Sequence, residues 1–256
     1  MTRIVACVSG KGGAGKTTLV ANLGVALTHL GKSVVVIDTN ISTPNLGLHL
    51  GVPFYPITLH DVLKGTARIK DAIYEHESGL RIIPAGISLK DLRGADPKHL
   101  PNTLLDLLGD ADIILLDVAA GLGREALSAI ETADEIILIT NPEVTSVTDA
   151  LKTAKLAQQI GTKVSGVVIN RVSNEKHEMK IEDVMSMLGD YSLLSIVPED
   201  INVQRAISRR TPVVHHRPRS AASKEINALA MKVAGENYNN YFYHDSWYKK
   251  VFSFLR

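Results

Sequence analysis

The sequence predicts an α/β fold: a three-layer sandwich in which helices cover both faces of a mostly parallel sheet. Short apolar runs alternate along the chain with helix-length segments, which is typical of parallel strands joined by helical crossovers. Several runs are apolar at every position, as in 113–116, so both faces of the sheet are expected to be covered. The expected strands are 3–9, 33–37, 80–83, 113–116, 136–139, 164–169 and 193–197.

Two segments carry the clearest helical pattern. Between Lys16 and Leu30, apolar residues recur on neighbouring turns, and Gly31 then ends the helix. A second helix is expected over 221–234. No internal repeat or linker divides the 256 residues. We therefore expect one domain over 1–236, followed by a short segment of different composition over 237–256.

Composition indicates a globular protein of the cytoplasm. Hydrophobic residues make up 45% of the chain and charged residues 21%, proportions that argue against a disordered chain. No apolar run reaches the roughly 20 residues that cross a bilayer, and the N-terminus lacks the pattern of a signal peptide. Cys7 is the only cysteine, which excludes disulfides within the chain and cysteine-ligated metal clusters. The net charge of +1 gives no overall attraction to nucleic acid.

A glycine-rich loop separates the first expected strand from the first expected helix. It satisfies the phosphate-loop pattern, and its residues are Gly10, Lys11, Gly12, Gly13, Ala14, Gly15, Lys16, Thr17 and Thr18. In such a loop, backbone N–H groups converge on phosphate oxygens at the positive end of a helix. Lys16 is expected to bridge the β- and γ-phosphates, and the Thr17 hydroxyl to ligate Mg²⁺. The motif therefore predicts a P-loop NTPase sandwich with ATP or ADP and Mg²⁺ as ligands.

Two aspartates, Asp38 and Asp117, end expected strands. Because the carboxyl ends of parallel strands share one edge of the sheet, both should lie beside the glycine-rich loop. Mg²⁺ and the attacking water must be held at this edge, so Thr17, Asp38 and Asp117 are the candidate metal-ligating residues. The alternative role of a strand-end aspartate is to cap the helix or turn that follows it.

Lys11 is a second lysine in the loop, one residue after its first glycine, and it gives the motif the deviant Walker A form. With this residue the chain resembles the MinD/ParA family over about 3–234, most closely its MinD branch. The resemblance implies that Lys11 reaches the phosphates bound by a partner copy, so that a homodimer forms when ATP is bound. It also implies a first switch over 38–48 and a second over 117–122, where the Gly121 backbone senses the γ-phosphate.

Asn40 departs from the pattern of this family, which has a second aspartate there to position or activate the attacking water. An amide accepts a hydrogen bond from water but lacks the charge and basicity of a carboxylate. Lys11, Lys16 and Asn40 are the candidate catalytic residues, and hydrolysis is expected to be slow. The alternative that Asn40 raises is a nucleotide-gated membrane scaffold with impaired hydrolysis.

Two short motifs resemble the adenine pocket of the family. Asn170 and Arg171 follow one expected strand, and Pro198, Glu199 and Asp200 follow another. By resemblance, Asn170 reads the exocyclic amine of adenine, and the backbone of the other motif borders the ring. Both motifs are also common at strand ends and turns that bind nothing.

The end of the chain is rich in aromatic residues, since eight of the twelve lie at or after Tyr238. Projected as a helix, most of them share one face, with Lys249 and Lys250 at its border. Such a helix can lie in the headgroup region of an anionic membrane, and MinD proteins end in one. We expect 238–256 to bind the cytoplasmic face of the cell membrane, with the ATP dimer presenting two copies. Packing of this segment on protein is the alternative.

These features favour a MinD-like ATPase that moves between cytoplasm and membrane and positions other proteins, such as division machinery, through an unidentified protein effector. The competing hypothesis is a ParA-type DNA-partitioning ATPase. Its support is a basic cluster made of Arg209, Arg210, His215, His216, Arg217 and Arg219. An ordinary solvated surface accounts for this cluster about as well.

Overall fold

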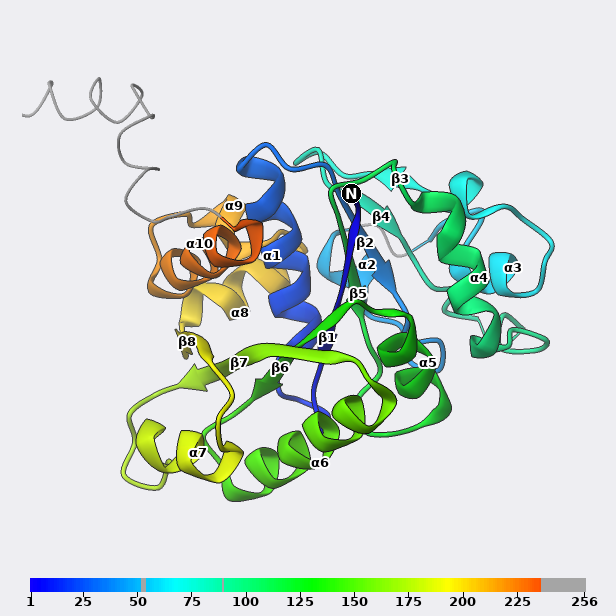
Figure 1. Ribbon diagram of the computed structural model, residues 1–256. Coiled ribbons are helices and arrows are strands. Elements are labelled where there is room, and N and C mark those ends of the chain that lie inside the picture. The colour runs from blue at the N-terminus through cyan, green and yellow to red at the C-terminus, as the bar shows by residue number, and fades with distance from the viewer. Residues whose placement is uncertain (52–53, 89, 236–256) are drawn as a thin grey trace, which may run out of the picture.

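The computed structural model describes residues 1–51, 54–88 and 90–235, which form a twisted eight-stranded sheet between two layers of helices (Figure 1). The strands are β1 (Arg3–Val8), β2 (Val34–Asp38), β3 (Tyr74–Glu75), β4 (Arg81–Ile83), β5 (Ile113–Asp117), β6 (Glu135–Thr140), β7 (Lys163–Val172) and β8 (Leu193–Pro198). Their order across the sheet is β3-β4-β2-β5-β1-β6-β7-β8. All neighbours pair in parallel except β3 and β4, which pair antiparallel.

Helices on the two faces bury two separate sets of apolar side chains. One face is covered by α1 (Lys16–His29), α2 (Leu46–His49), α8 (Ile201–Ser208), α9 (Val213–His216) and α10 (Ala221–Ala234). The other is covered by α3 (Leu59–Leu63), α4 (Leu100–Leu104), α5 (Arg124–Thr132), α6 (Val144–Ile160) and α7 (Ile181–Leu188). Three short 3₁₀ helices complete the elements: η1 (Ile69–Ala72), η2 (Pro97–His99) and η3 (Leu105–Leu107).

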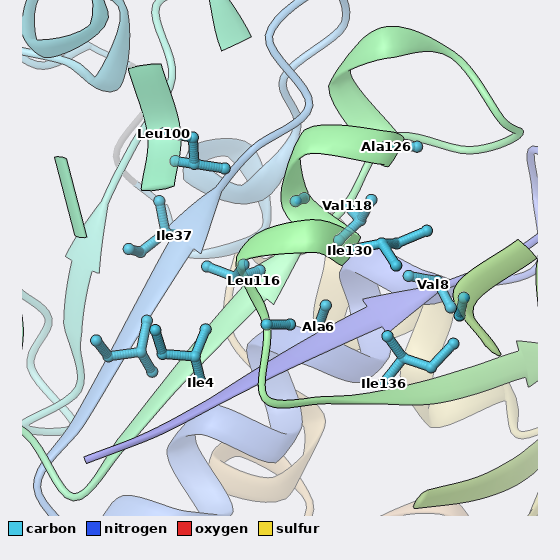
Figure 2. Close-up of a cluster of buried hydrophobic side chains, with 14 of the residues drawn as sticks. Ile4, Ala6, Val8, Ile37, Leu100, Leu116, Val118, Ala126, Ile130 and Ile136 are labelled. Atoms are coloured by element: carbon cyan, nitrogen blue, oxygen red, sulfur yellow. The ribbon is translucent and has the colours of Figure 1, made fainter. Parts of the chain in front are cut away.

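The central strand β1 shows why both layers are needed. Ile4, Ala6 and Val8 face the α5 side, whereas Val5 and Cys7 face the α1 side, and all five are buried (Figure 2). Each fully buried Leu, Ile or Val side chain contributes about 1.5–3 kcal/mol. The sheet is therefore stabilised from both faces, as its all-apolar strands predict. Burial also raises the pKa of the Cys7 thiol to about 12, so Cys7 is an inert core residue.

The position of β1 in the sheet creates the site. The chain crosses from β1 to α1 on one face, while the neighbouring strands β5 and β6 lead into α5 and α6 on the other. Loops that follow adjacent strands thus diverge above the carboxyl edge, which is where open α/β sheets bind ligands.

All seven expected strands are present, and the predicted α/β sandwich is confirmed. The helix expected from Lys16 begins there and ends at His29, with Gly31 in the left-handed conformation (φ of 79°). The antiparallel edge strand β3 was not predicted, because two residues give no readable periodicity. The helix expected over 237–256 and the end of the domain at 236 lie outside the described residues.

Within the described part of the chain, no helix is both long and apolar enough to cross a membrane.

Candidate functional site

The glycine-rich loop after β1 makes two close approaches that leave no room for a side chain. A Cβ atom on Gly10 would lie 2.2 Å from the backbone carbon of Asp149 in α6, and one on Gly15 would lie 2.4 Å from Nδ2 of Asn170. Gly15 also has a φ of 81°, in the left-handed region, immediately before α1. Glycine therefore lets the loop turn tightly onto the N-terminus of α1. The free N–H groups and positive dipole end of this helix suit an anion.

A cavity of about 950 Å³ lies over this loop. The segment after β2, the carboxyl ends of β7 and β8, the residues that follow β8 and the start of α5 help to form its wall. The sequence-predicted residues that line it are Lys11, Gly12, Gly13, Ala14, Gly15, Lys16, Thr17, Thr18, Asn40, Asn170, Arg171, Pro198, Glu199 and Asp200. Val197 and Ile226 add apolar surface near β8. A polar loop at one end and apolar surface at the other suit a ligand with a charged and a flat apolar part.

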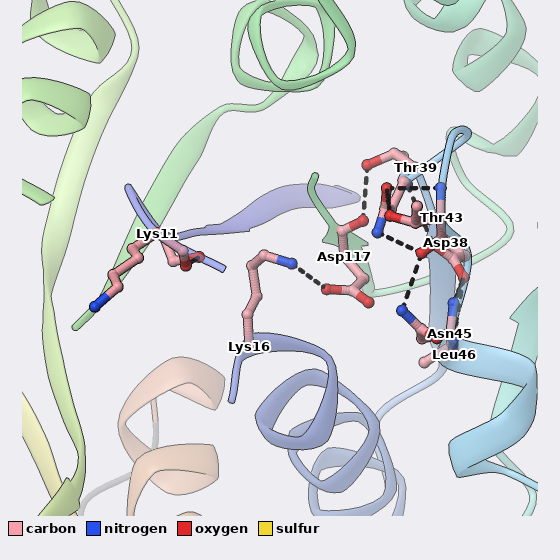
Figure 3. A network of polar contacts seen from close by, with 10 residues as sticks. Lys11, Lys16, Asp38, Thr39, Thr43, Asn45, Leu46 and Asp117 are labelled. Atoms are coloured by element: carbon pink, nitrogen blue, oxygen red, sulfur yellow. Dashed lines mark hydrogen bonds and ion pairs between the residues drawn. The ribbon is translucent and has the colours of Figure 1, made fainter. Parts of the chain in front are cut away.

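A buried ion pair joins the loop to β5. Nζ of Lys16 lies 3.1 Å from Oδ1 of Asp117, and the two side chains are only 7% and 1% exposed (Figure 3). The other oxygen, Oδ2 of Asp117, is buried without a hydrogen-bond partner among the described residues. Because an unsatisfied buried oxygen costs free energy, this atom marks a point where a cation or water is favoured.

Asp38 lies beside Asp117 because the two residues are register partners in β2 and β5. Its Oδ1 accepts the N–H of Asn40 at 3.1 Å, and its Oδ2 accepts those of Asn45 and Leu46 at 3.1 and 3.0 Å. Burial and, next in size, the Asp117 carboxylate raise the pKa of Asp38 to about 7. Two carboxyl groups beside one ammonium group form a site that a divalent cation stabilises.

Few side chains could ligate a metal here. In the described ranges, no group of three or more His, Cys, Asp or Glu side chains is arranged to hold a metal ion. The predicted set of Thr17, Asp38 and Asp117 offers one hydroxyl and two carboxyl groups. Mg²⁺ commonly takes one or two carboxylates and completes its shell with water and phosphate oxygens, so this small set fits Mg²⁺ better than a metal that needs a full protein cage.

The Asn40 side chain turns toward its own loop. Its Nδ2 donates to the Thr43 carbonyl at 2.7 Å, and its Oδ1 accepts the Thr43 N–H at 3.3 Å and the Thr43 hydroxyl at 3.1 Å. Asn45 donates to the same carbonyl at 3.0 Å. Asn40 thus stabilises the turn after β2, and these bonds leave one N–H of its amide for the cavity.

Lys11 points away from Lys16, toward the outside of the loop (Figure 3). Its Nζ lies 3.3 Å from Oε2 of Glu143, and the two side chains are 49% and 56% exposed. An ion pair this exposed contributes only about 0–1 kcal/mol. Lys11 is therefore held weakly and is available to another ligand.

Two residues near the end of β7 contact the outer side of the loop. Nδ2 of Asn170 donates to the Ala14 carbonyl at 2.7 Å, and Nη1 of Arg171 donates to the Gly13 carbonyl at 3.4 Å. Nε of Arg171 also donates to Glu199 at 2.8 Å. Arg171 has a φ of 61°, an uncommon value for a residue other than glycine. These contacts hold the ends of β7 and β8 against the loop.

Comparison with known proteins identifies the domain. Residues 5–213 match the family described as the CobQ/CobB/MinD/ParA nucleotide binding domain. The chain belongs to this MinD/ParA family. The resemblance carried by Lys11 and the glycine-rich loop is therefore confirmed.

Individual members of the MinD/ParA family align along most of the chain. An uncharacterised ATP-binding protein of Methanocaldococcus jannaschii is 43% identical over 238 residues, which are 93% of this chain and 90% of that protein. The MinD of Pyrococcus horikoshii complexed with Mg-ADP is 38% identical and superposes with a TM-score of 0.88, covering 91% of this chain and 96% of that one. A chain of the MinC:MinD cell division complex of Aquifex aeolicus is 30% identical, with a TM-score of 0.81 and coverage of 92% and 96%.

Four of the sequence-predicted site residues are not among those lining the cavity: Gly10, Asp38, Asp117 and Gly121. The Gly121 N–H donates to the Ser9 carbonyl at 3.1 Å, so the segment after β5 is bonded to the start of the loop. Asp200 caps α8 by accepting the Asn202 N–H at 2.8 Å, and it also accepts the Ala222 N–H at 3.2 Å. The capping role that sequence reasoning gave as the alternative for Asp38 is also present, since Asp38 accepts the N–H groups of Asn45 and Leu46 at the start of α2.

Sequence reasoning missed a contact between the loop after β2 and the start of α5 in this MinD/ParA domain. The Ser42 hydroxyl donates to Oε1 of Glu125, and the Ser42 N–H donates to Oε2 at 3.3 Å. Ser42, Thr43, Arg124 and Glu125 all line the cavity. The available signal was the place of Glu125 in the first turn of the helix that follows Asp117, at the same edge of the sheet.

Proposed function

We propose that this chain is an ATPase that binds MgATP in the cavity over the glycine-rich loop, dimerises with ATP bound and associates reversibly with membranes to position other proteins. The observation that carries the proposal is the buried Lys16–Asp117 pair with its unsatisfied Oδ2, directly beside a phosphate loop. The Mg-ADP in the similar Pyrococcus horikoshii MinD supports the choice of ligand.

The residues of the loop then have separate tasks. Backbone N–H groups at the start of α1 bind phosphate oxygens, and Lys16 holds the β- and γ-phosphates. Thr17 and Asp117, with Asp38 behind them, hold Mg²⁺, which when bound neutralises charge on the phosphates. The unsatisfied Oδ2 of Asp117 and the raised pKa of Asp38 are the features that fit a cation here.

The adenine base is proposed to lie between the carboxyl ends of β7 and β8. Nδ2 of Asn170 is used by Ala14, which leaves its Oδ1 to accept a hydrogen bond from an exocyclic amine. The backbone of Pro198, Glu199 and Asp200 borders the ring, with Arg171 and Glu199 held together at the rim. A guanine carbonyl at the same place would face the Asn170 oxygen and be repelled.

Dimerisation with ATP is proposed to depend on Lys11. This side chain leaves Glu143 at little cost, since the pair is half exposed, and binds the phosphates of the nucleotide held by a second copy. ATP brings more phosphate charge than ADP, so the ATP state favours the dimer. Turnover is proposed to be slow because the Asn40 amide is engaged by Thr43 and carries no charge.

Membrane association is proposed to occur through 238–256, on the cytoplasmic face of the cell membrane. The aromatic residues and Lys249 and Lys250 in this segment support it. One short amphipathic helix binds lipid weakly, whereas a dimer with two copies binds through effective concentration. The effector is proposed to be a second protein, and the MinC:MinD complex of a similar chain supports a partner of that kind.

A DNA-partitioning function is the second candidate. Arg209, Arg210, Arg217 and Arg219 are exposed, and none of them forms an ion pair with a described residue. Such a patch can bind phosphate backbones at low salt. The net charge of +1 and the aromatic C-terminal segment favour the membrane proposal over this one.

Sedimentation with liposomes tests the proposal. Full-length protein should sediment with anionic liposomes in MgATP and remain in solution in MgADP. Deletion of 238–256 should abolish sedimentation while MgATP binding persists. Equal sedimentation in ATP and ADP, or equal sedimentation of full-length and shortened protein, would contradict the membrane switch. A DNA mobility shift of the shortened protein that weakens steeply with salt would favour the second candidate.

A further inference from the structure

The first switch of this protein has an amide at Asn40, and both ends of this amide are bonded to Thr43. The one carboxylate of this switch, Asp38, accepts three backbone N–H groups and is assigned above to Mg²⁺. Three acidic side chains line the cavity: Glu125, Glu199 and Asp200. Glu199 is paired with Arg171, and Asp200 caps α8, so both are engaged in contacts at the end of the cavity next to β8. Of the three, Glu125 is the one that lies at the first switch.

The topology explains why a residue of α5 reaches the loop after β2. β2 and β5 are neighbours in the sheet, and Asp38 and Asp117 end them side by side. The chain then enters the first switch from β2 and the second switch from β5, and α5 begins at Arg124. Glu125 therefore stands in the first turn of α5 with its carboxylate against Ser42, two residues after Asn40.

The Glu125 carboxylate is oriented but not saturated. One oxygen accepts the Ser42 hydroxyl and the other accepts the Ser42 N–H. A carboxylate has about four acceptor positions, so two bonds leave others free to bind water. Its side chain is partly exposed and lines the same cavity as Lys16, Asn40 and Thr43. The group thus combines a fixed position, a negative charge and access to the phosphate side of the cavity.

We propose that Glu125 supplies the carboxylate that Asn40 lacks, by binding the attacking water and accepting its proton. The inference rests on the ATPase function proposed above. The water oxygen forms a bond to the terminal phosphorus of ATP, and the bond from that phosphorus to the bridging oxygen breaks, its electron pair remaining on ADP. The proton moves from water to the Glu125 carboxylate and then to the released phosphate or solvent, so the products are ADP and inorganic phosphate.

This arrangement couples hydrolysis to the contact between the first switch and the start of α5. Glu125 is positioned by Ser42, so the water-binding carboxylate is in place only while the loop after β2 lies against the start of α5. The carboxylate is therefore in place only in molecules in which this contact is formed. We therefore expect ATP turnover to be slow and to depend on Glu125.

The test compares Glu125→Gln with the unsubstituted full-length chain. Glutamine keeps the shape and can accept one of the two Ser42 bonds, but it is not a base, so turnover in phosphate-release assays should fall by about 10²-fold or more. The MgATP affinity of Glu125→Gln, measured by calorimetry, should equal that of the unsubstituted chain. In light scattering, the ATP-dependent dimer of Glu125→Gln should last longer than the dimer of the unsubstituted chain. Glu131→Gln, which removes the same charge from an exposed position of α5, is the matched control and should behave as the unsubstituted chain.

Two further variants distinguish a role of Glu125 as the base from a role in holding the loop after β2 in place. Asn40→Asp should restore turnover in the Glu125→Gln background, because it returns a carboxylate to the first switch. Ser42→Ala should lose less activity than Glu125→Gln, whereas a purely structural contact predicts equal losses for both and no rescue by Asn40→Asp. That second pattern would overturn the inference.

Three other outcomes separate failure of this inference from failure of the proposed ATPase function. Equal turnover of Glu125→Gln and Glu131→Gln would overturn the inference and leave the proposed ATPase function intact. An unsubstituted chain that binds MgATP without turnover, while Asn40→Asp hydrolyses it, would overturn the inference in the same way. Calorimetry that detects no MgATP binding to the unsubstituted chain would instead refute the proposed function.

Discussion

The Lys16–Asp117 pair makes the stability of the ligand-free protein sensitive to a single substitution, Lys16→Met. Methionine preserves most of the side-chain volume but removes the ammonium group that lies 3.1 Å from the Asp117 carboxylate. Asp38, the register partner of Asp117, stays beside it, so two buried carboxyl groups then face each other without a cation. The variant should fold less stably although no cavity is created.

The expected loss of stability is large because Lys16 and Asp117 are both buried. With exposures of 7% and 1%, the pair is screened little by solvent. Removing one partner of a buried pair typically costs about 3–5 kcal/mol, because the other charge stays buried and unpaired. For a domain of this size 1 kcal/mol corresponds to about 2–4 °C in Tm, so a decrease of about 6–20 °C is expected.

Urea unfolding at pH 8 without nucleotide measures this free energy directly. The double variant Lys16→Met/Asp117→Asn removes both charges and should recover part of the loss. The same change at an exposed pair, Arg68→Met/Asp71→Asn, should affect stability far less than Lys16→Met does. A Lys16→Met destabilisation below about 1 kcal/mol, or a double variant less stable than Lys16→Met, would refute the reasoning.

Three other predictions concern single residues. The pKa of Asp38 is about 7 in the folded protein and 3.8 ordinarily, so between these values the folded state holds a proton that the unfolded chain has released. The free energy of unfolding should therefore decrease from pH 4 to 7 more steeply in the unsubstituted chain than in Asp38→Asn, and parallel urea curves would contradict this. Lys11→Ala should keep most of the MgATP affinity but lose the ATP dimer in light scattering, and a variant that still dimerises would exclude a role of Lys11 across the interface. Asn40→Asp should raise the rate of phosphate release, within the range of about 10²–10⁴-fold that a base or water-positioning group contributes. An unchanged rate would show that another group limits the step.

Much of the fold could be predicted because the central strands are apolar at every position. Ile113–Asp117 is buried throughout, and a strand of this kind can lie only inside a sheet covered on both faces. The glycine-rich loop was readable for a similar reason, since Gly10 and Gly15 stand where a Cβ atom would collide with the chain. The proximity of Asp38 to Asp117 followed from the shared carboxyl edge of parallel strands.

The features of the site that could not be predicted depend on contacts between residues far apart in the sequence, or on side-chain orientations, which leave no pattern in the sequence. Glu125 and Ser42 are 83 residues apart, and they meet because β2 and β5 are neighbours in a strand order that the sequence does not display. The orientation of Asn40 depends on how its turn closes on Thr43, so the sequence showed the missing carboxylate but not where the amide points. The two residues of β3 are placed by pairing with β4 and not by their own periodicity.

The central claim is that the glycine-rich loop binds MgATP, and calorimetric titration of full-length protein and its Lys16→Met variant tests it most directly. The unsubstituted chain should bind MgATP with one nucleotide per chain, and binding should weaken when Mg²⁺ is chelated. Lys16→Met, confirmed as folded by circular dichroism, should lose most of this affinity, because the charge-assisted bonds to the phosphates are gone. Equal MgATP affinity in the two proteins would contradict the assignment of the site.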